Sequence, residues 1–269
     1  MGRGFAVLLS LSVARVAAGQ PLFDTHLHYD TDAAQRLPPD RIVSLLQSSD
    51  IRHAVVTGSP PAQVLTLVEA APGRVIPALG VYREAGDKQT WMFDGDLPGR
   101  VAEQLKRGPW RAVGELHLLA ARRHSPVFLR IVDMASARGL PLLMHCDPAV
   151  IDTLFERSPR ARVIWAHAGS YPYPPLLRDY LDRYPQLYID VSMRDRLLAP
   201  DGVLDPAWEN LLWEYPDRFM VGVDTFSVER WTGYASHAGR IRQWLAQLPA
   251  DVAERIAYRN AARVFGVAP

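Results

Sequence analysis

Two histidines with one residue between them, His26 and His28, lie at the end of an apolar run that begins at Leu22. On a β-strand the side chains of residues i and i+2 share a face, so the two imidazoles project together. Asp24 precedes them, and imidazoles beside a carboxylate suit a divalent transition metal. The pair alone is equally consistent with one packed and one surface histidine. Whether the two histidines bind a metal therefore depends on which residues the rest of the chain supplies.

Side chains of the metal-ligand type recur where later apolar runs end. They are Glu115 after Gly114, His145 before Cys146, His167 after Ala166, and Asp224 after Val223. Burying an isolated charge costs several kcal/mol unless the charge is paired or bound to a metal. Together with His26 and His28, these residues therefore predict one metal centre.

Eight short apolar runs alternate with longer amphipathic stretches, and each run is nearly continuously apolar, as parallel strands covered on both faces are. The runs are residues 22–28, 53–57, 74–81, 112–117, 140–146, 162–167, 186–191 and 219–224. Helix starts lie between them at Pro39-Asp40, Ser125-Pro126 and Asp205-Pro206. The pattern predicts an α/β fold.

We expect residues 20–269 to form a single-domain (β/α)8 TIM barrel rather than an open sheet. An open doubly wound sheet usually has a glycine-rich phosphate turn after its first strand, and here that turn reads His28-Tyr29-Asp30-Thr31-Asp32. In a barrel the C-terminal strand ends converge on one site. The six metal-type side chains are therefore expected to meet there.

The composition of the chain limits the classes of molecule that it is expected to bind. Lys and Arg number 30 against 29 Asp and Glu, and no dense basic run occurs, so the chain is not expected to bind nucleic acid. Cys146 is the single cysteine, which excludes an intramolecular disulfide and a zinc site of several thiolates. A small-molecule substrate fits this chain best, and the sequence leaves both a monomer and a homo-oligomer open.

The first residues resemble an export signal. Arg3 precedes the apolar stretch 5–13, and small residues follow at 17–19, as in a secretory signal peptide. The apolar stretch is shorter than the roughly 20 residues that a membrane span needs. We expect residues 1–19 to be a signal peptide and the mature protein to be periplasmic or secreted. An uncleaved tethering segment is the alternative, because Arg15 departs from the pattern.

The ordered motifs resemble the amidohydrolase superfamily of metal-dependent hydrolases, in particular its amidohydrolase-related (amidohydrolase-2) branch. The resemblance covers everything after the signal segment, and the last helix resembles the closing helix of the family. The motifs that carry it are Asp24-Thr25-His26-Leu27-His28, Gly114-Glu115, His145, Trp165-Ala166-His167-Ala168-Gly169, Gly222-Val223-Asp224 and Tyr258-Arg259-Asn260-Ala261-Ala262-Arg263-Val264-Phe265-Gly266.

The resemblance implies a role for each of the six side chains. His26, His28 and Asp224 would bind the tighter metal, with zinc preferred and manganese next. Glu115 falls where some members bridge two metals. His145 and His167 would complete a second metal site, or His167 would act as an unbound acid or base, so one or two ions stay open.

The implied activity is hydrolysis of an ester, lactone or amide bond by a metal-activated water, with Asp224 and His167 as catalytic residues. Arg194 and Arg83 are the candidates for binding an anionic group of the substrate. A decarboxylase of aromatic or muconate-type acids is the alternative, and a non-catalytic ligand-binding barrel is a lesser one.

The sequence departs from the family pattern at two places that bear on the class of substrate and on the shape of its pocket. DNA-trimming relatives extend the Gly-Glu motif into Gly-Glu-Ile-Gly-Leu-Asp, whereas here it continues Leu116-His117-Leu118, which disfavours a nuclease. Thr225-Phe226 follows Asp224 in place of the common Trp-Pro or Tyr-Pro, so the floor of the substrate pocket is expected to differ. His117 lies two residues beyond Glu115 and could support the ligands from behind.

Overall fold

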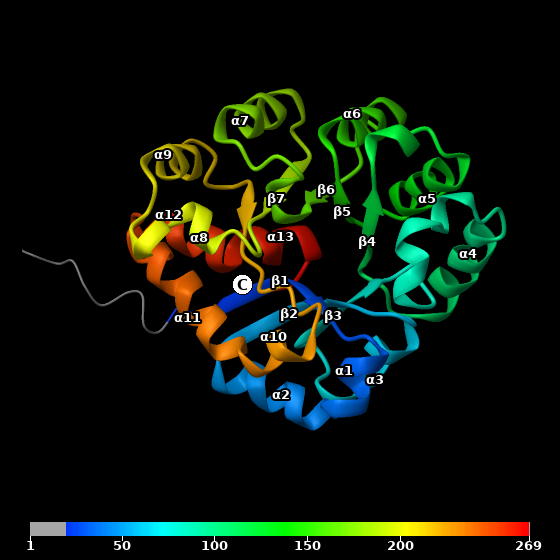
Figure 1. The fold of residues 1–269 in the computed structure, drawn as a ribbon, viewed down its shortest axis with the longest axis horizontal. Coiled ribbons are helices and arrows are strands. Elements are labelled where there is room, and N and C mark those ends of the chain that lie inside the picture. Colours follow the sequence, from blue (N-terminus) through cyan, green and yellow to red (C-terminus); the bar gives the residue numbers. More distant parts are fainter. Residues whose placement is uncertain (1–19, 269) are drawn as a thin grey trace, which may run out of the picture.

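Residues 20–268 are described by a computed structural model, and the expected signal segment 1–19 lies outside the described residues. Eight parallel strands follow one another in chain order around a barrel, so the predicted TIM-barrel fold is confirmed (Figure 1). The strands are β1 (Leu22–His28), β2 (Ile51–Thr57), β3 (Val75–Leu79), β4 (Ala112–Leu118), β5 (Leu142–Cys146), β6 (Val163–Trp165), β7 (Leu187–Asp190) and β8 (Phe219–Met220).

Helices surround the strands on the outside, and the helix at the C-terminal end of the chain lies across one end of the barrel instead (Figure 1). They are α1 (Thr31–Arg36), α2 (Pro39–Ser48), α3 (Ala62–Ala70), α4 (Leu97–Arg107), α5 (Pro126–Ala137), α6 (Pro148–Arg157), α7 (Pro174–Arg183), α8 (Asp195–Leu198), α9 (Pro206–Glu214), α10 (Val228–Thr232), α11 (Tyr234–Leu245), α12 (Ala250–Glu254) and α13 (Asn260–Phe265). Short helical turns η1 (Ala85–Gln89), η2 (Trp91–Phe93), η3 (Ala120–Arg122), η4 (Ala166–Ala168), η5 (Pro200–Gly202) and η6 (Arg255–Arg259) lie between them. Within residues 20–268, no helix combines the length and the apolar character needed to span a bilayer.

Two of the strands that are shorter than predicted end before a predicted site residue, which therefore lies outside the strand. The expected strand 162–167 ends at Trp165, and His167 lies in η4 with a φ of 58°. The expected strand 219–224 ends at Met220, and Asp224 has a φ of 59°. A left-handed backbone ends a strand, so both side chains project from turns at the barrel mouth.

The barrel closes between β1 and the chain after β8 through separate hydrogen bonds. The Thr25 amide donates to the Val221 carbonyl at 2.9 Å, and the Asp224 amide donates to the His26 carbonyl at 2.7 Å. The Asp24 carboxylate adds a third link, because Oδ1 accepts the Val223 amide at 3.1 Å. Closure thus fixes His26 and Asp224 next to each other.

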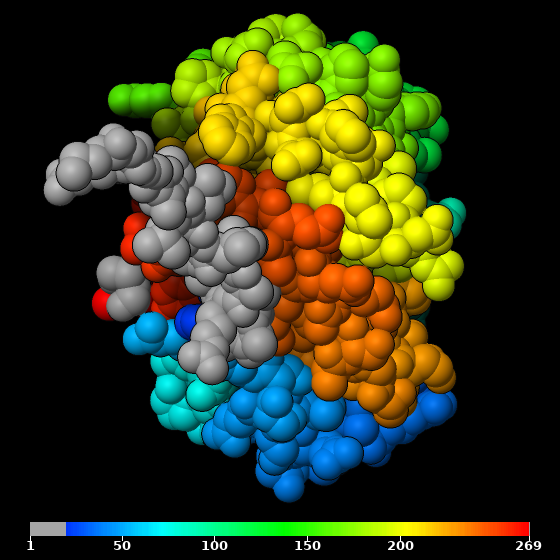
Figure 2. Space-filling model, turned by 90° about the vertical axis from the view of Figure 1, so that its left-hand side faces the viewer, coloured from blue at the N-terminus to red at the C-terminus, as the bar shows by residue number. Residues whose placement is uncertain are grey.

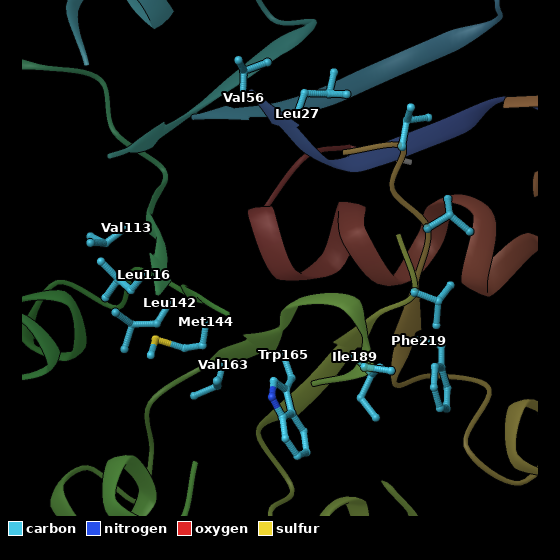
Figure 3. Close-up of a cluster of buried hydrophobic side chains, with 14 of the residues drawn as sticks. Leu27, Val56, Val113, Leu116, Leu142, Met144, Val163, Trp165, Ile189 and Phe219 are labelled. Carbon is cyan, nitrogen blue, oxygen red and sulfur yellow. The ribbon is translucent and has the colours of Figure 1, made fainter. Parts of the chain in front are cut away.

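Two apolar layers hold the barrel. The outer layer packs the strands against the helices, with side chains such as Leu27, Val56, Trp165 and Phe219 fully buried (Figure 3). On one side of the molecule the orange helix α11 contacts both α2 and α8 (Figure 2).

The inner layer fills the barrel and continues into α13. Phe23, Leu143 and Met220 from the strands belong to one buried cluster with Tyr258 and Phe265 from the end of the chain. Arg162, which precedes β6, donates to the Val264 carbonyl at 2.8 Å. The C-terminal helix therefore closes the end of the barrel where the strands begin, opposite the metal-type side chains.

Candidate metal centre

Two strand irregularities turn the site residues into the barrel. Asp24 pairs with Ala54 and Leu27 pairs with Val56, so three steps along β1 match two along β2. Such a bulge reverses the alternation of side chains. As a result Phe23 faces the interior and so does His26, three positions later.

Strand β4 contains the same kind of bulge. Val113 pairs with Leu142 and Leu116 with Met144, again three steps against two. Ala112 belongs to the inner layer, and Glu115, three positions on, faces the same interior. Gly114 lies in the bulge at a φ of +133°, and a Cβ there would lie 2.4 Å from the Leu143 carbonyl oxygen, so only glycine fits.

His26 is buried and its tautomer is fixed. Nδ1 lies 2.7 Å from Oδ2 of Asp190, the last residue of β7. An ionised carboxylate only accepts, so Nδ1 bears the proton and Nε2 of the neutral ring carries a lone pair. Nε2 lies 3.3 Å from Nε2 of His28 and 3.5 Å from Oε1 of Glu115.

His167 is oriented in the same way from the next strand. Nδ1 lies 3.2 Å from the Ser192 carbonyl oxygen and 2.9 Å from Ser192 Oγ. Ser192 Oγ donates its own proton to Asp190 Oδ2 at 2.6 Å, so it accepts from His167. Nε2 of His167 therefore presents a lone pair, 3.2 Å from Glu115 Oε1 and 3.7 Å from Asp224 Oδ2.

Glu115 lies at the centre of the cluster. Nδ1 of His145 is 3.0 Å from Oε1, and Nε2 of His28 is 3.3 Å from Oε2. The six predicted ligands thus lie together. The sequence predicts this proximity only if the chain forms a barrel, because the six residues come from segments that are far apart along the chain. His117, which approaches Oε2 at 3.4 Å, joins them from the same strand as Glu115.

Asp224 has a buried oxygen with no hydrogen-bond partner among the described residues. That atom, Oδ1, lies 3.5 Å from Nε2 of His28 and 4.0 Å from Nε2 of His26. The carboxylate oxygen and the Nε2 lone pair of a neutral His26 cannot satisfy one another, and Nε2 of His28 lies beside both. They are the donor set that zinc prefers, and Zn–N bonds of about 2.0–2.1 Å place two tetrahedral ligands about 3.3–3.4 Å apart. The residues fit a divalent cation.

The charges of the cluster support this fit. Burial acts to lower the pKa of His26, but the carboxylates of Glu115 and Asp224 outweigh it and raise that pKa well above its usual value. Without a metal, Nε2 of His26 therefore binds a proton, and a metal ion would take the place of that proton. Burial acts to raise the pKa of Glu115, but the positive charge of His26 and the close approach of the His145 and His167 rings hold it well below its usual value. The centre of the cluster therefore attracts positive charge.

A cavity of about 370 Å³ opens onto these side chains. Lys88, Met193, Arg194 and Phe226 line it together with His28, His117, His145 and His167. Arg194 lies at its wall, where Nε donates to the His167 carbonyl at 2.7 Å and Nη2 to the Gly169 carbonyl at 3.3 Å.

The structure does not bring Arg83 to this cavity. Its side chain is exposed, pairs with Asp87 at 3.2 Å, and lines a neighbouring hollow that also contains Phe226. A larger hollow of about 640 Å³, lined by residues such as Asp195 and Trp244, contains no histidine. The chemistry therefore belongs to the smaller cavity.

Sequence reasoning missed Asp190, Ser192 and Lys88. A signal for Asp190 existed, since a carboxylate at the end of the apolar run 186–191 needs a buried partner. Lys88 lies in η1, a turn that the sequence pattern did not predict. Asp24, in contrast, does not face the metal ligands, because its oxygens accept from Val223, His26 and Tyr234 in the seam between β1 and β8.

Comparisons with known proteins agree with this architecture. A TatD homologue from Escherichia coli K12 has a TM-score of 0.64 at 15% identity, covering 92% of this chain and 98% of the other. A probable 2-pyrone-4,6-dicarboxylic acid hydrolase from Acinetobacter baumannii, with citric acid bound, has a TM-score of 0.60 at 16% identity, covering 91% and 99%. An amidohydrolase from Burkholderia multivorans, with HEPES bound, has a TM-score of 0.58 at 16% identity, covering 92% and 100%.

At these identities the structures establish the fold alone, and no curated protein matches the sequence. The family follows from the sequence itself. A family model described as amidohydrolase matches residues 23–267, which is nearly all of the barrel. The chain belongs to the amidohydrolase family of hydrolytic enzymes.

Proposed function

We propose that the protein is a metal-dependent hydrolase that cleaves an ester, lactone or amide bond of a small anionic molecule. His26, His28, Asp224 and Glu115 would hold a divalent ion, zinc before manganese, and His145 and His167 would complete the site. The observation that carries the proposal is Oδ1 of Asp224, which is buried without a hydrogen-bond donor among the described residues and lies 4.0 Å and 3.5 Å from the Nε2 atoms of His26 and His28.

A bound divalent ion would lower the pKa of a water molecule and polarise the carbonyl of the substrate. Asp224 would accept the proton of the attacking water at Oδ2, the oxygen that lies 3.7 Å from Nε2 of His167. Asp224 could then return this proton to the leaving group. His167 offers a lone pair at Nε2, so its role is that of a ligand or a base.

Substrate anchoring is proposed for Arg194. Two of its nitrogens bind carbonyl oxygens of the turn after β6, which fixes the guanidinium at the cavity wall. Its remaining N–H groups could bind an anionic oxygen. Arg83 would reach only a substrate that extends beyond Phe226 into the neighbouring hollow.

The test is metal content by elemental mass spectrometry, followed by activity on aryl esters, lactones and amides. We expect one or two equivalents of zinc or manganese, with less in Asp224→Asn and Glu115→Gln. The matched control is Asp133→Asn, because Asp133 lies on the surface of α5 and pairs with Arg157.

Chelation should abolish hydrolysis and added zinc should restore it. A protein that stays metal-free in the presence of zinc would refute the proposal. Release of carbon dioxide from aromatic acids, with no hydrolysis of any substrate in the panel, would identify the decarboxylase alternative instead.

A further inference from the structure

His117 is a further ionisable side chain of the cluster, and the proposed mechanism gives it no task. It lies on β4 two residues after Glu115, lines the cavity, and places Nε2 3.4 Å from Oε2 of Glu115. Its distances to Glu115 and His145 alone would admit it as a metal ligand. The position of the proton on its imidazole ring, however, indicates a different role.

Tyr82 determines which nitrogen of His117 bears the proton. The buried Tyr82 hydroxyl oxygen accepts the His117 backbone N–H at 2.7 Å and lies 3.1 Å from His117 Nδ1. A phenol keeps its proton at neutral pH and, when buried, needs an acceptor for it. Nδ1 is the only acceptor that the described residues offer, so Tyr82 donates to Nδ1.

A neutral imidazole carries a single N–H, so that of His117 is at Nε2. The opposite tautomer would leave the buried phenol proton without an acceptor. Within residues 20–268 this Nε2–H makes no hydrogen bond: Oε2 of Glu115, the acceptor beside it, lies 3.4 Å away, and the His117 side chain lines the cavity. A nitrogen that bears a proton has no lone pair for a metal, and Nδ1 is already occupied.

The ring cannot turn away from this position easily. It stacks on His145 with centroids 4.4 Å apart and planes at 24°. The Trp91 indole donates to the His117 carbonyl at 2.8 Å, which fixes the backbone behind the ring. His117 is thus a preorganised donor at the wall of the cavity.

Lys88 adds a positive charge to the same wall. It lines the cavity beside His117, and the structure gives it no ion pair among the described residues. This side of the cavity therefore presents donors and a cation. The complementary ligand is an anionic oxygen with more than one lone pair to share.

We propose that His117 and Lys88 bind a carboxylate of the substrate, and that His117 is a hydrogen-bond donor rather than a ligand of the metal. The inference rests on the proposed function, because it assigns a wall of the same cavity. It names the substrate class as a carboxylic acid whose scissile bond lies beside Glu115 and Asp224.

The first test is the tautomer of His117, read from two-bond ¹H–¹⁵N correlations of histidine-labelled protein. His117→Asn identifies the signals. We expect the Nε2–H form in the metal-free and the zinc-loaded protein, and a loss of this preference in Tyr82→Phe. An Nδ1–H form, or an Nε2 that binds zinc, would overturn the inference.

The second test compares benzoate with its neutral isostere benzamide on zinc-loaded protein. We expect Lys88→Met and His117→Leu each to weaken benzoate about tenfold or more and to change benzamide less than about twofold, since a hydrogen bond to a charged group is lost. Lys106→Met is the matched control, because Lys106 lies exposed on α4 and pairs with Glu103.

Unchanged benzoate affinity in Lys88→Met would overturn the proposal, whether or not His117→Leu folds. Failure of the proposed function is seen separately. A protein that binds no zinc would refute the metal-dependent hydrolase, whereas the His117 tautomer is still measured in the metal-free state.

Discussion

At the scale of single residues, Asp190 decides what His26 can bind. Its Oδ2 accepts from His26 Nδ1, and its Oδ1 accepts from the Ser192 amide at 2.9 Å. The ring is thereby held with its Nε2 lone pair toward Glu115 and His28. A carboxylate behind a metal-binding histidine fixes the tautomer and makes the ligand more basic.

Asp190→Asn should therefore weaken zinc binding about 10- to 100-fold, the usual effect of losing such a partner. The amide has one acceptor where the carboxylate has two, so either His26 or Ser192 loses its partner. The measurement is a zinc Kd by chelator competition, with Asp133→Asn as the control. An unchanged Kd in Asp190→Asn would mean that His26 is oriented by other contacts.

The types of the six ligands could be predicted from the sequence, because each polar residue ends an apolar run and the fold brings these ends together. Their tautomers could not. The proton on His26 depends on Asp190, 164 positions away, and that on His117 depends on Tyr82, 35 positions away. No local pattern encodes such pairings.

At the scale of elements, the site depends on how closely β1, β7 and the chain after β8 approach one another. Gly222 lies at this contact. A Cβ on Gly222 would lie 2.8 Å from the His26 Cβ and 2.9 Å from Asp190 Oδ1. The closure of the barrel and the geometry of the metal ligands are therefore coupled at this position.

Gly222→Ala should lower the free energy of unfolding by about 1–3 kcal/mol, as overpacking of a core does, and should also weaken zinc binding. Gly239→Ala is the control, since a Cβ there meets nothing within 4 Å on α11 and should stabilise the helix by up to about 1 kcal/mol. Denaturant unfolding and zinc titration measure both effects. Equal behaviour of the two variants would contradict the coupling.

Strands and their order follow from the apolar pattern, but the bulges in β1 and β4 do not. Regular alternation would place Phe23 and His26 on opposite faces, whereas the structure places both inside. A bulge arises from pairing with the neighbouring strand, which a single run of residues does not record. The short β8 has the same origin, because Val221 and Asp224 bond to β1 outside a regular ladder.

The seam between β1 and β8 contains a titrating carboxyl. Burial raises the pKa of Asp24 to about 7, against 3.8 for the ordinary group, although Tyr234 donates to Oδ2 at 2.6 Å. Because the folded pKa lies above the unfolded one, the folded chain binds more protons between these pH values. The contribution of Asp24 to stability is therefore greatest at low pH and decreases as the pH rises from about 4 to 7.

Asp24→Asn keeps the shape of the side chain and removes this titration. The stability of the variant relative to the native protein should increase by up to about 4 kcal/mol between pH 4 and pH 8. The measurement is denaturant unfolding across this range in the presence of a chelator, so that no metal adds a pH dependence of its own. Parallel stability curves would show that Asp24 does not titrate in the folded state.

At the scale of the whole molecule, the candidate metal centre and the apolar packing around α13 lie at opposite ends of the barrel. The metal-type side chains lie where the strands end, while α13 and the inner apolar layer close the end where the strands begin. Phe265 is buried there and stacks on Phe23 with ring centroids 5.7 Å apart. In barrels of this kind the active site is built at one face and the other face serves stability.

Phe265→Ala should therefore lower the free energy of unfolding by about 3–5 kcal/mol, the usual cost of removing a buried aromatic ring. The zinc content of the folded fraction should stay the same, because no ligand contacts Phe265. Denaturant unfolding and elemental analysis of the same preparation measure the two properties together. A folded Phe265→Ala protein that has lost its zinc would show that the closed end of the barrel also sets the geometry of the metal centre, through Phe23 and the bulge that follows it in β1.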